Sequence, residues 1–270
     1  AQAICLKRFI KMLFINTRPV DRAASLTMAL EQRAVEVYGL PLLELLPRAW
    51  DHDLARLYRQ LVYTQVIVVV SPSAVQFGMA HLLQSGLTVS DLQHIQWIAV
   101  GQKTAQALAE YGLGSVVPEV ETSEGMLQLP VLQNLASDAS IAFWRGEGGR
   151  QFMMDTLMQH GRLILNFVLY ERRCPNETMQ QQAELIQCLS EHNHYVALIS
   201  SEASWLNWLA LLDTNIQLLQ QGHFLVLGER LAQILKQYQQ QMHVPFKMSV
   251  LKDLKTATIV QLLQSEQGNA

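Results

Sequence analysis

Four strand-to-helix turns recur in the same order in the two halves of the sequence, and this repeat constrains the fold more than any other feature. In each turn an apolar run of strand length is followed by Gly, Ser, Thr or Arg and then by a segment with helical spacing of apolar residues. The paired positions, which lie 127, 129, 127 and 133 residues apart, are Arg18 with Arg145, Ser71 with Ser200, Gly101 with Gly228 and Ser123 with Thr256. The sequence therefore predicts two copies of one α/β unit, with a cleft between two similar lobes as a common place for a ligand.

The alternation of apolar runs and helical segments indicates parallel sheets. Residues 66–70 read Val-Ile-Val-Val-Val, which suits a central parallel strand that is covered on both faces. Further strands are predicted over residues 12–16, 95–100, 141–144, 166–170, 195–199 and 224–227.

Charge and composition exclude several classes of function. The 270 residues include 20 Lys and Arg against 23 Asp and Glu, whereas bulk nucleic-acid binding requires a basic surface. No run of 18 apolar residues is present, so a membrane-spanning helix is not expected. The three cysteines, Cys5, Cys174 and Cys188, are odd in number and lack a Cys-x-x-Cys spacing, which favours a reducing compartment over a disulfide framework or a zinc ribbon.

The opening residues 1–11 make a poor signal peptide. They carry Lys7, Arg8 and Lys11 within an apolar stretch and have no small-residue cleavage pattern. We interpret residues 1–11 as an N-terminal extension, with Met12 as a candidate natural start. The sequence thus predicts a cytoplasmic protein with neither a nucleic-acid nor a membrane partner.

A glycine-rich turn follows the predicted strand at 141–144. Gly146, Gly148 and Gly149 would place free N–H groups at a helix start, which suits an anion. The spacing is not that of the dinucleotide fingerprint, and no acidic residue ends a strand some 20 residues later. A carboxylate-binding turn or a plain connection is favoured over a nucleotide site.

Three other candidate groups each have an alternative, structural interpretation. His192 and His194 form a pair without a nearby third metal ligand, so a solvated loop is favoured. Ser71 and Ser200 lack the Gly-x-Ser-x-Gly setting of a nucleophile, and helix capping and ligand contact both remain open for them. Tyr170 is either a half-buried aromatic at a strand end or a phenol at the mouth of the cleft.

Five short motifs together resemble the uroporphyrinogen-III synthase family, and the likeness runs from about residue 12 to residue 263. They are Asn16-Thr17-Arg18-Pro19, Val69-Val70-Ser71-Pro72-Ser73-Ala74-Val75, Val100-Gly101-Gln102-Lys103-Thr104-Ala105, Arg145-Gly146-Glu147-Gly148-Gly149-Arg150 and Tyr170-Glu171-Arg172. Each motif is weak alone, whereas their order and spacing are specific.

The resemblance implies an α/β fold of two similar three-layer α/β/α lobes with parallel, flavodoxin-like sheets. A two-stranded connector would join the lobes, with the active-site cleft between them. The first lobe would comprise residues 12–43 plus 173–266 and the second 44–172. The repeat alone would divide the chain near residue 137, because the opening strand and helix of each copy would be exchanged between lobes.

The resemblance also implies a reaction. Hydroxymethylbilane, a linear tetrapyrrole with eight carboxylates, would cyclise to uroporphyrinogen III with loss of water and inversion of the last ring, the D ring. No cofactor and no metal would take part, and the enzyme would be a monomer. Transient contact with the preceding pathway enzyme is an open alternative. Such catalysis is mainly positioning, which explains why no triad or metal cluster stands out.

Residue roles follow from the matching motifs. Tyr170 would be catalytic, hydrogen-bonding near the departing hydroxyl so that it leaves as water. Substrate carboxylates would be bound by Ser71, Ser73, Thr104 and Ser200, by the helix starts at Gly101 and Gly228, and by Arg18, Lys103 and Arg145. Surface or interlobe ion pairing is the open alternative for each cation. The second copy reads Gly228-Glu229-Arg230-Leu231, without the hydroxyl that many members of the family carry there.

Two other functions remain open at this point. One is a non-catalytic, two-lobed binder of small anionic ligands, and the other is a nucleotide-dependent enzyme that uses the turn at 146–149.

Overall fold

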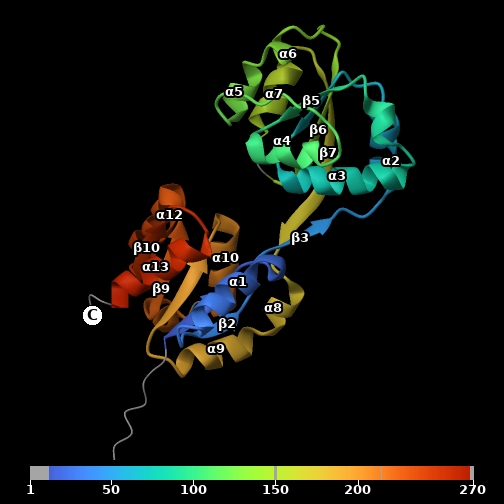
Figure 1. Ribbon diagram of the computed structural model, residues 1–270. Coiled ribbons are helices and arrows are strands. Elements are labelled where there is room, and N and C mark those ends of the chain that lie inside the picture. The colour runs from blue at the N-terminus through green and yellow to red at the C-terminus, as the bar shows by residue number, and fades with distance from the viewer. Residues whose placement is uncertain (1–11, 149–150, 214, 268–270) are drawn as a thin grey trace, which may run out of the picture. The chain divides into compact units, whose positions relative to one another are not determined.

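The computed structural model describes residues 12–148, 151–213 and 215–267 (Figure 1). Contacts divide the chain into two units, one formed by residues up to Glu44 together with those from Arg173 onward, the other by Leu45–Arg172. The lobe boundary expected at residues 43 and 44 lies one residue from this division. The expected N-terminal extension, residues 1–11, lies outside the described residues.

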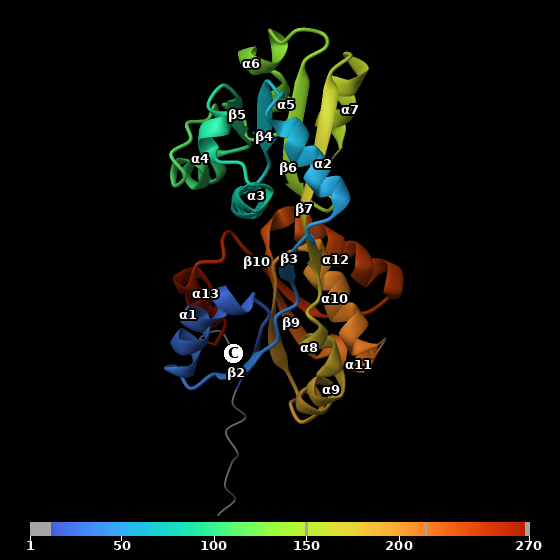
Figure 2. The same cartoon turned by 90° about the vertical axis from the view of Figure 1, so that its right-hand side faces the viewer.

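Unit 1 is built on a five-stranded sheet with the order β10-β9-β8-β1-β2, and all its neighbouring strands are parallel. The strands are β1 (Leu13–Asn16), β2 (Glu36–Gly39), β8 (Tyr195–Ile199), β9 (Gly222–Leu227) and β10 (Lys247–Leu251). One face is covered by α1 (Val20–Glu31) and α13 (Thr256–Gln267). The other face carries α9 (Gln182–Ser190), α10 (Glu202–Leu212), α11 (Ile216–Gln220) and α12 (Gly228–Met242), after the short α8 (Asn176–Gln180), as Figure 2 shows.

Strand periodicity explains the two cores of this unit. Successive side chains of a strand point to opposite faces of the sheet. Phe14 accordingly packs with α1 and α13, whereas Leu13 and Ile15 pack in the cluster on the opposite face. Both faces are apolar, so the central strands read as continuous hydrophobic runs.

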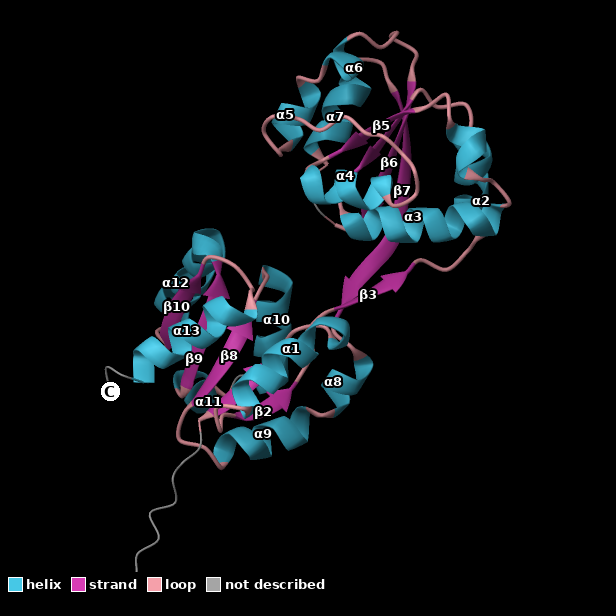
Figure 3. Cartoon of the chain, viewed as in Figure 1, coloured by secondary structure: helices cyan, strands magenta, loops and turns pink. Residues whose placement is uncertain are grey.

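Unit 2 has a second five-stranded sheet with the order β3-β7-β6-β4-β5. Figure 3 shows the strands of both units in magenta and the helices in cyan. The strands are β3 (Glu44–Pro47), β4 (Val66–Val69), β5 (Gln96–Ala99), β6 (Ser140–Gly146) and β7 (Leu163–Arg173), and the pairs β4–β5, β4–β6 and β6–β7 are parallel. One core cluster joins the sheet to α2 (His52–Leu61), α3 (Pro72–Ser85), η1 (Val89–Leu92) and α4 (Gln102–Ala109). The opposite cluster joins it to α5 (Ser123–Leu127), α6 (Pro130–Gln133) and α7 (Phe152–Gln159).

The two strand orders show how the sequence repeat is distributed. The sheet of unit 1 takes β1 and β2 from the first half of the chain and β8, β9 and β10 from the second. The sheet of unit 2 takes β4 and β5 from the first half and β6 and β7 from the second, in matching places. Val116 forms an isolated parallel bridge with Ile98 beside β5, where unit 1 has β10 beside β9. Each sheet therefore combines strands from both copies.

The predicted α/β fold class with parallel sheets is confirmed, and the predicted strands match β1, β4, β5, β6, β7, β8 and β9. Three strands were not predicted, namely β2, β3 and β10. Within the described ranges, none of the helices has the length and apolar character that a bilayer crossing requires.

Candidate active site

The predicted site residues lie at or near the carboxyl ends of parallel strands, the edge at which α/β sheets bind ligands. In unit 1 they are Arg18 after β1, Ser200 after β8 and Gly228 after β9. In unit 2 they are Ser71 and Ser73 after β4, Gly101, Lys103 and Thr104 after β5, Arg145 in β6 and Tyr170 in β7. All of them therefore belong to the same edge of their sheet.

A pocket of about 180 Å³ brings three of these residues together within unit 2. Ser71, Arg145 and Tyr170 all line it, and so does Arg172. Its remaining wall is largely apolar and is formed by residues that include Phe143, Met126, Met153 and Met154. The pocket thus combines two guanidinium groups and the hydroxyls of Ser71, Ser123 and Tyr170 with a hydrophobic wall, a suitable surface for a ligand that has both apolar and anionic groups.

An irregularity in the sheet sets the position of Tyr170. The register between β6 and β7 shifts at Arg145 and Gly146. Arg145 pairs with Val168 and Gly146 with Tyr170, so Leu169 of β7 has no partner in β6. The amide of Glu147 donates to the carbonyl of Tyr170 at 2.7 Å. Such bulges commonly re-aim a side chain beside an active site. Here the phenol ring is almost fully buried and lies against the backbone of Gly146.

Glycine is required at position 146 by this close approach. A Cβ added there would lie 2.5 Å from two ring carbons of Tyr170 and 2.9 Å from its hydroxyl. On another side the ring of Phe77 packs against Tyr170 with the centroids 5.1 Å apart. The phenol is therefore held in a fixed place. With 1% of its surface exposed, Tyr170 is more buried than the half-buried strand-end aromatic of the structural alternative.

The hydroxyl of Tyr170 contacts two polar side chains. Ser71 Oγ lies 3.0 Å from Tyr170 Oη, and Arg172 Nη2 donates to the same Oη at 3.2 Å. Ser71 is also the N-cap of α3, where its Oγ accepts the amide hydrogen of Ala74 at 3.0 Å. Ser71 thus caps the helix and also contacts Tyr170, so the capping interpretation is confirmed, while contact of Ser71 with a ligand stays a prediction.

Arg145 is a buried cation, only 6% exposed, so the surface ion-pair alternative does not apply to it. Its guanidinium donates to the carbonyl of Gly146 at 3.3 Å and to the carbonyl of Gly148. Burial lowers the pKa of Arg145, and the nearby Tyr170 acts in the opposite direction. Because its usual pKa is far above neutrality, the group stays charged and places positive potential in the pocket wall.

The start of α4 is occupied by an internal carboxylate. Glu121 Oε1 accepts the amide hydrogen of Gln102 at 2.8 Å, and the same carboxylate lies against Gly101. Sequence reasoning missed Glu121, because it is 19 residues away from its partner. Nearby, the side chain of Lys103 is exposed and Thr104 is buried.

In unit 1 one of the two alternatives left open for Ser200, helix capping, is wrong, and ligand contact stays a prediction. The helix after β8 is capped by Ser201 rather than by Ser200: Ser201 Oγ accepts the amide hydrogen of Ser204 at 3.1 Å, and Ser204 Oγ accepts that of Ser201 at 3.0 Å. This reciprocal arrangement requires a hydroxyl three residues before Ser204, so it selects Ser201. Gly228 opens α12 with φ +76°, a conformation that favours glycine. Arg18 is partly buried, and burial lowers its pKa.

The histidine pair does not converge on a common point. His192 contacts the carbonyl of Cys188 through Nδ1 at 2.8 Å and Glu36 through Nε2 at 3.7 Å, whereas His194 is exposed. Among the described residues, no group of three or more His, Cys, Asp or Glu side chains is arranged to hold a metal ion. Of the glycine-rich turn, Gly148 has φ +72°, and Gly149 lies outside the described residues.

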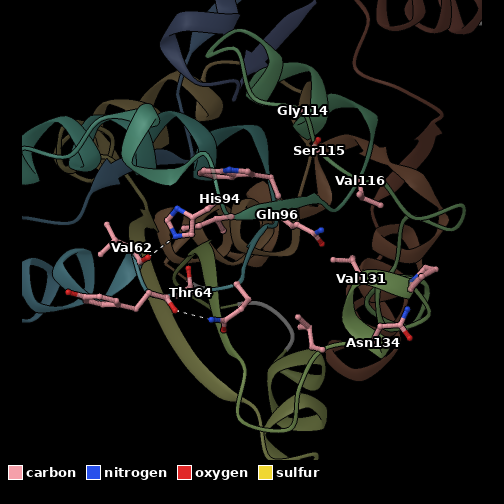
Figure 4. Close-up of a pocket in the computed structure, with 15 residues that line it drawn as sticks. Val62, Thr64, His94, Gln96, Gly114, Ser115, Val116, Val131 and Asn134 are labelled. Carbon is pink, nitrogen blue, oxygen red and sulfur yellow. Dashed lines mark hydrogen bonds between the residues drawn. The ribbon is translucent and has the colours of Figure 1, made fainter.

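A second cavity, which sequence reasoning did not predict, lies at the amino edge of the same sheet (Figure 4). Its volume is about 1180 Å³, and the described residues that line it include no Asp, Glu, Lys or Arg. His94 Nε2 contacts the carbonyl of Val62 at 2.8 Å on its wall, as Figure 4 shows. The cavity is large, but its described lining offers no carboxylate, ammonium or guanidinium group to a ligand.

Arg172 is a functional candidate that was missed although the sequence contains a signal for it. It belongs to the Tyr170-Glu171-Arg172 motif, yet only its tyrosine was assigned a role. Side chains two positions apart in a strand share a face, and β7 runs through both residues. Because Arg172 lies two positions after Tyr170, the alternation of side chains along the strand places it beside the phenol.

Known proteins resemble this chain along most of its length. The sequence model of the family described as Uroporphyrinogen-III synthase HemD matches residues 24–249. The uroporphyrinogen-III synthase of Escherichia coli (strain K12) is 29% identical over 163 residues, which cover 60% of this chain and 65% of that protein, just under two thirds.

Solved structures share the fold at low sequence identity. A mutant uroporphyrinogen III synthase from the extremely thermophilic bacterium Thermus thermophilus is 14% identical and superposes with a TM-score of 0.64 over 96% of this chain and 100% of that one. The uroporphyrinogen-III synthetase from Helicobacter pylori 26695 is 15% identical and has a TM-score of 0.60 over 94% and 99%. Sequence and fold agree: this chain belongs to the uroporphyrinogen-III synthase HemD family.

Proposed function

We propose that this chain is a uroporphyrinogen-III synthase, a hydro-lyase that cyclises hydroxymethylbilane with loss of water and inversion of the D ring. The observation that carries the proposal is the pocket at the carboxyl edge of the unit 2 sheet, where Tyr170, Ser71 and Arg145 meet. Membership of the family supports the same reaction.

The first step is departure of the hydroxyl from the first ring of the substrate. The pyrrole nitrogen supplies the electron pair that breaks the carbon–oxygen bond, and the leaving hydroxyl takes a proton from Tyr170 Oη and departs as water. The product of this step is a resonance-stabilised azafulvene cation. A hydrogen-bond donor fixed in a partly apolar pocket stabilises the developing charge far better than water does.

The second step decides the isomer. The substituted carbon of the D ring attacks the cation and gives a spiro intermediate, which fragments and recloses at the other position of that ring. Fragmentation breaks the bond from the substituted carbon to its bridging methylene, and the unsubstituted α-carbon of the same ring then bonds to that methylene. This second carbon loses its proton as the pyrrole becomes aromatic again, and the proton restores the phenol. Spontaneous closure gives the uninverted isomer, so the enzyme must hold the bent chain in the less accessible geometry.

The enzyme would hold the substrate in this geometry by binding its carboxylates. We assign them to Arg145, Arg18 and Lys103, and to the hydroxyls or helix starts at Ser71, Ser73, Gly101, Thr104, Ser200 and Gly228. Helix starts carry partial positive charge that favours carboxylates. The placement of the ligand between the two units, the absence of a cofactor, the monomeric state and the cytoplasmic location all stay predictions.

The test is to supply freshly made hydroxymethylbilane and to resolve the products by isomer. We expect uroporphyrinogen III in excess over the type I isomer that forms without an enzyme. Type I alone, formed at the rate of the buffer control, would reject the proposal and leave the binder of small anionic ligands. A thermal shift with ATP or NAD would instead support the nucleotide-dependent alternative.

A further inference from the structure

We propose that Arg172 is a positioning residue for this reaction: with Ser71 it fills the acceptor sites of the Tyr170 oxygen, so that the phenolic hydrogen points into the pocket. The inference rests on the proposed function and deepens it. It concerns a residue to which the site assignment above gives no role in the reaction.

The first support is the geometry of Arg172. Its Nη2 donates to Tyr170 Oη at 3.2 Å, and its Cζ lies 5.5 Å from the centroid of the phenol ring. A guanidinium can only donate hydrogen bonds, so Tyr170 accepts in this contact. The positive charge also turns the phenolic hydrogen away from Arg172, because the dipole of the hydroxyl aligns with its oxygen toward the cation.

The second support is the bonding of Ser71. Its Oγ already accepts the amide hydrogen of Ala74 at the start of α3. A hydroxyl that accepts a hydrogen bond becomes a stronger donor, because successive hydrogen bonds polarise one another. Ser71 therefore donates to Tyr170 Oη across their 3.0 Å contact. With two lone pairs engaged, the oxygen of Tyr170 keeps only its own hydrogen for the substrate.

The neighbouring Arg173 shows that this contact is specific to one arginine. Arg173 follows Arg172 in β7, so its side chain points to the other face of the strand. Its Nε donates to Glu44 Oε1 at 2.8 Å, and it does not line the pocket. The pair gives a matched control, because the same substitution can be made at adjacent positions with and without contact to the phenol.

Activity measurements separate positioning from direct carboxylate binding. For Arg172→Gln we expect kcat to fall about tenfold with KM changed less than about twofold, since a charge-assisted hydrogen bond is lost only on the phenol. Arg172→Lys keeps a cationic donor and should recover most of the rate, and Arg173→Gln should leave both constants unchanged. A raised KM at constant kcat would mean that Arg172 binds a substrate carboxylate, and would overturn the proposal.

A double-mutant cycle tests whether Arg172 affects kcat through the hydroxyl of Tyr170. If Arg172 acts through the hydroxyl of Tyr170, then Arg172→Gln has no further effect on kcat once Tyr170→Phe has removed that hydroxyl. Effects that multiply in the double variant would contradict the proposal.

A spectroscopic readout makes the contact testable without turnover. With tyrosine labelled at ¹³Cζ, the signal of Tyr170 is the one that Tyr170→Phe removes. We expect it to move in Arg172→Gln and to stay in place in Arg173→Gln. An unmoved signal would reject the proposal whatever the activity. If the wild type made no uroporphyrinogen III while the signal moved, the proposed function would fail and the contact would stand.

Discussion

The two edges of the unit 2 sheet differ in both size and chemistry. The amino-edge cavity is several times larger than the carboxyl-edge pocket, yet the described residues that line it include no Asp, Glu, Lys or Arg, whereas the pocket contains Arg145, Arg172 and Tyr170. Helices begin at the carboxyl edge and direct N–H groups toward it, while they end at the amino edge and leave carbonyl groups there. Charge and donor direction, rather than volume, mark the edge that suits a polyanion.

Hydrogen bonds at the amino edge illustrate the difference. His94 contacts the carbonyl of Val62, and Gln65 Nε2 donates to the carbonyl of Tyr63 at 3.2 Å, both just after the end of α2. At the carboxyl edge the equivalent groups are the amides of Ala74 and Gln102. The substrate proposed above, with its eight carboxylates, would be attracted to the carboxyl edge by Arg145 and Arg172 and repelled by carbonyl groups at the amino edge.

The largest effect is expected from Tyr170→Phe. Removal of a pre-positioned donor costs about 10²- to 10³-fold in kcat, with the fold intact. The matched control is Tyr58→Phe: Tyr58 is also buried in unit 2 and donates to the carbonyl of Gly78 at 2.8 Å, away from the pocket. That variant should lose about 1 kcal/mol in the free energy of unfolding and keep its turnover. Unchanged turnover in Tyr170→Phe would remove the phenol from the mechanism.

Gly146→Ala should have the next largest effect. Its Cβ would overlap the ring of Tyr170, and a displacement of about 1 Å at a reacting group costs about 10²-fold in rate. Gly114→Ala is the control at the amino edge, because a Cβ there meets nothing within 4 Å. Steady-state rates and thermal melts of both variants test whether the carboxyl edge, and not the amino edge, is sensitive to an added methyl group. Equal rates for the two alanine variants would contradict it.

Ser71→Ala should act on stability and turnover together. The variant loses the cap of α3, which costs about 1 kcal/mol in the free energy of unfolding, and a donor to Tyr170. We expect kcat to fall about fivefold through the second loss. Urea unfolding and initial rates measure the two effects separately. A stability loss without a rate loss would show that Ser71 only caps the helix.

Glu121→Gln should improve substrate binding. The carboxylate of Glu121 occupies the start of α4, where the substrate is proposed to place one of its own. Removal of this competing charge should lower KM about threefold. Glu110→Gln, at the other end of α4, serves as the control. An unchanged KM in Glu121→Gln would exclude the start of α4 from the binding surface.

The smallest effect is expected at the amino edge. Gln96 and Asn134 are exposed and line the large cavity. Their replacement by Ala should leave kcat/KM within about twofold of the wild type, since surface substitutions away from a site are nearly neutral. A tenfold loss in either variant would place function at the larger cavity and reverse the comparison of the two edges.

Much of the fold could be predicted because buried parallel strands have a clear sequence pattern. Val66–Val69 is buried at every position, and its β-branched run is unmistakable. The three missed strands lie at the edges of the sheets, and their burial patterns are mixed: β2, β3 and β10 each keep two exposed residues. Edge strands pack against fewer neighbours, so their sequences are less constrained.

The site was predicted only as far as local sequence determines it. Ser71, Arg145 and Tyr170 each follow or end an apolar run, and the structure brings them together. Their distances depend on the strand order and on the bulge at Gly146, neither of which a local pattern encodes. Glu121 reaches α4 from a loop, and Ser201 replaces Ser200 as a cap because Ser204 fixes the register.

Hydrogen–deuterium exchange with and without saturating uroporphyrinogen III tests most directly which edge of the unit 2 sheet binds the ligand. The account predicts slower exchange in peptides that cover residues 70–74, 101–104 and 145–148, at the carboxyl edge, and no change in residues 62–65, 94–97 and 114–116. Protection confined to the amino-edge peptides would contradict it.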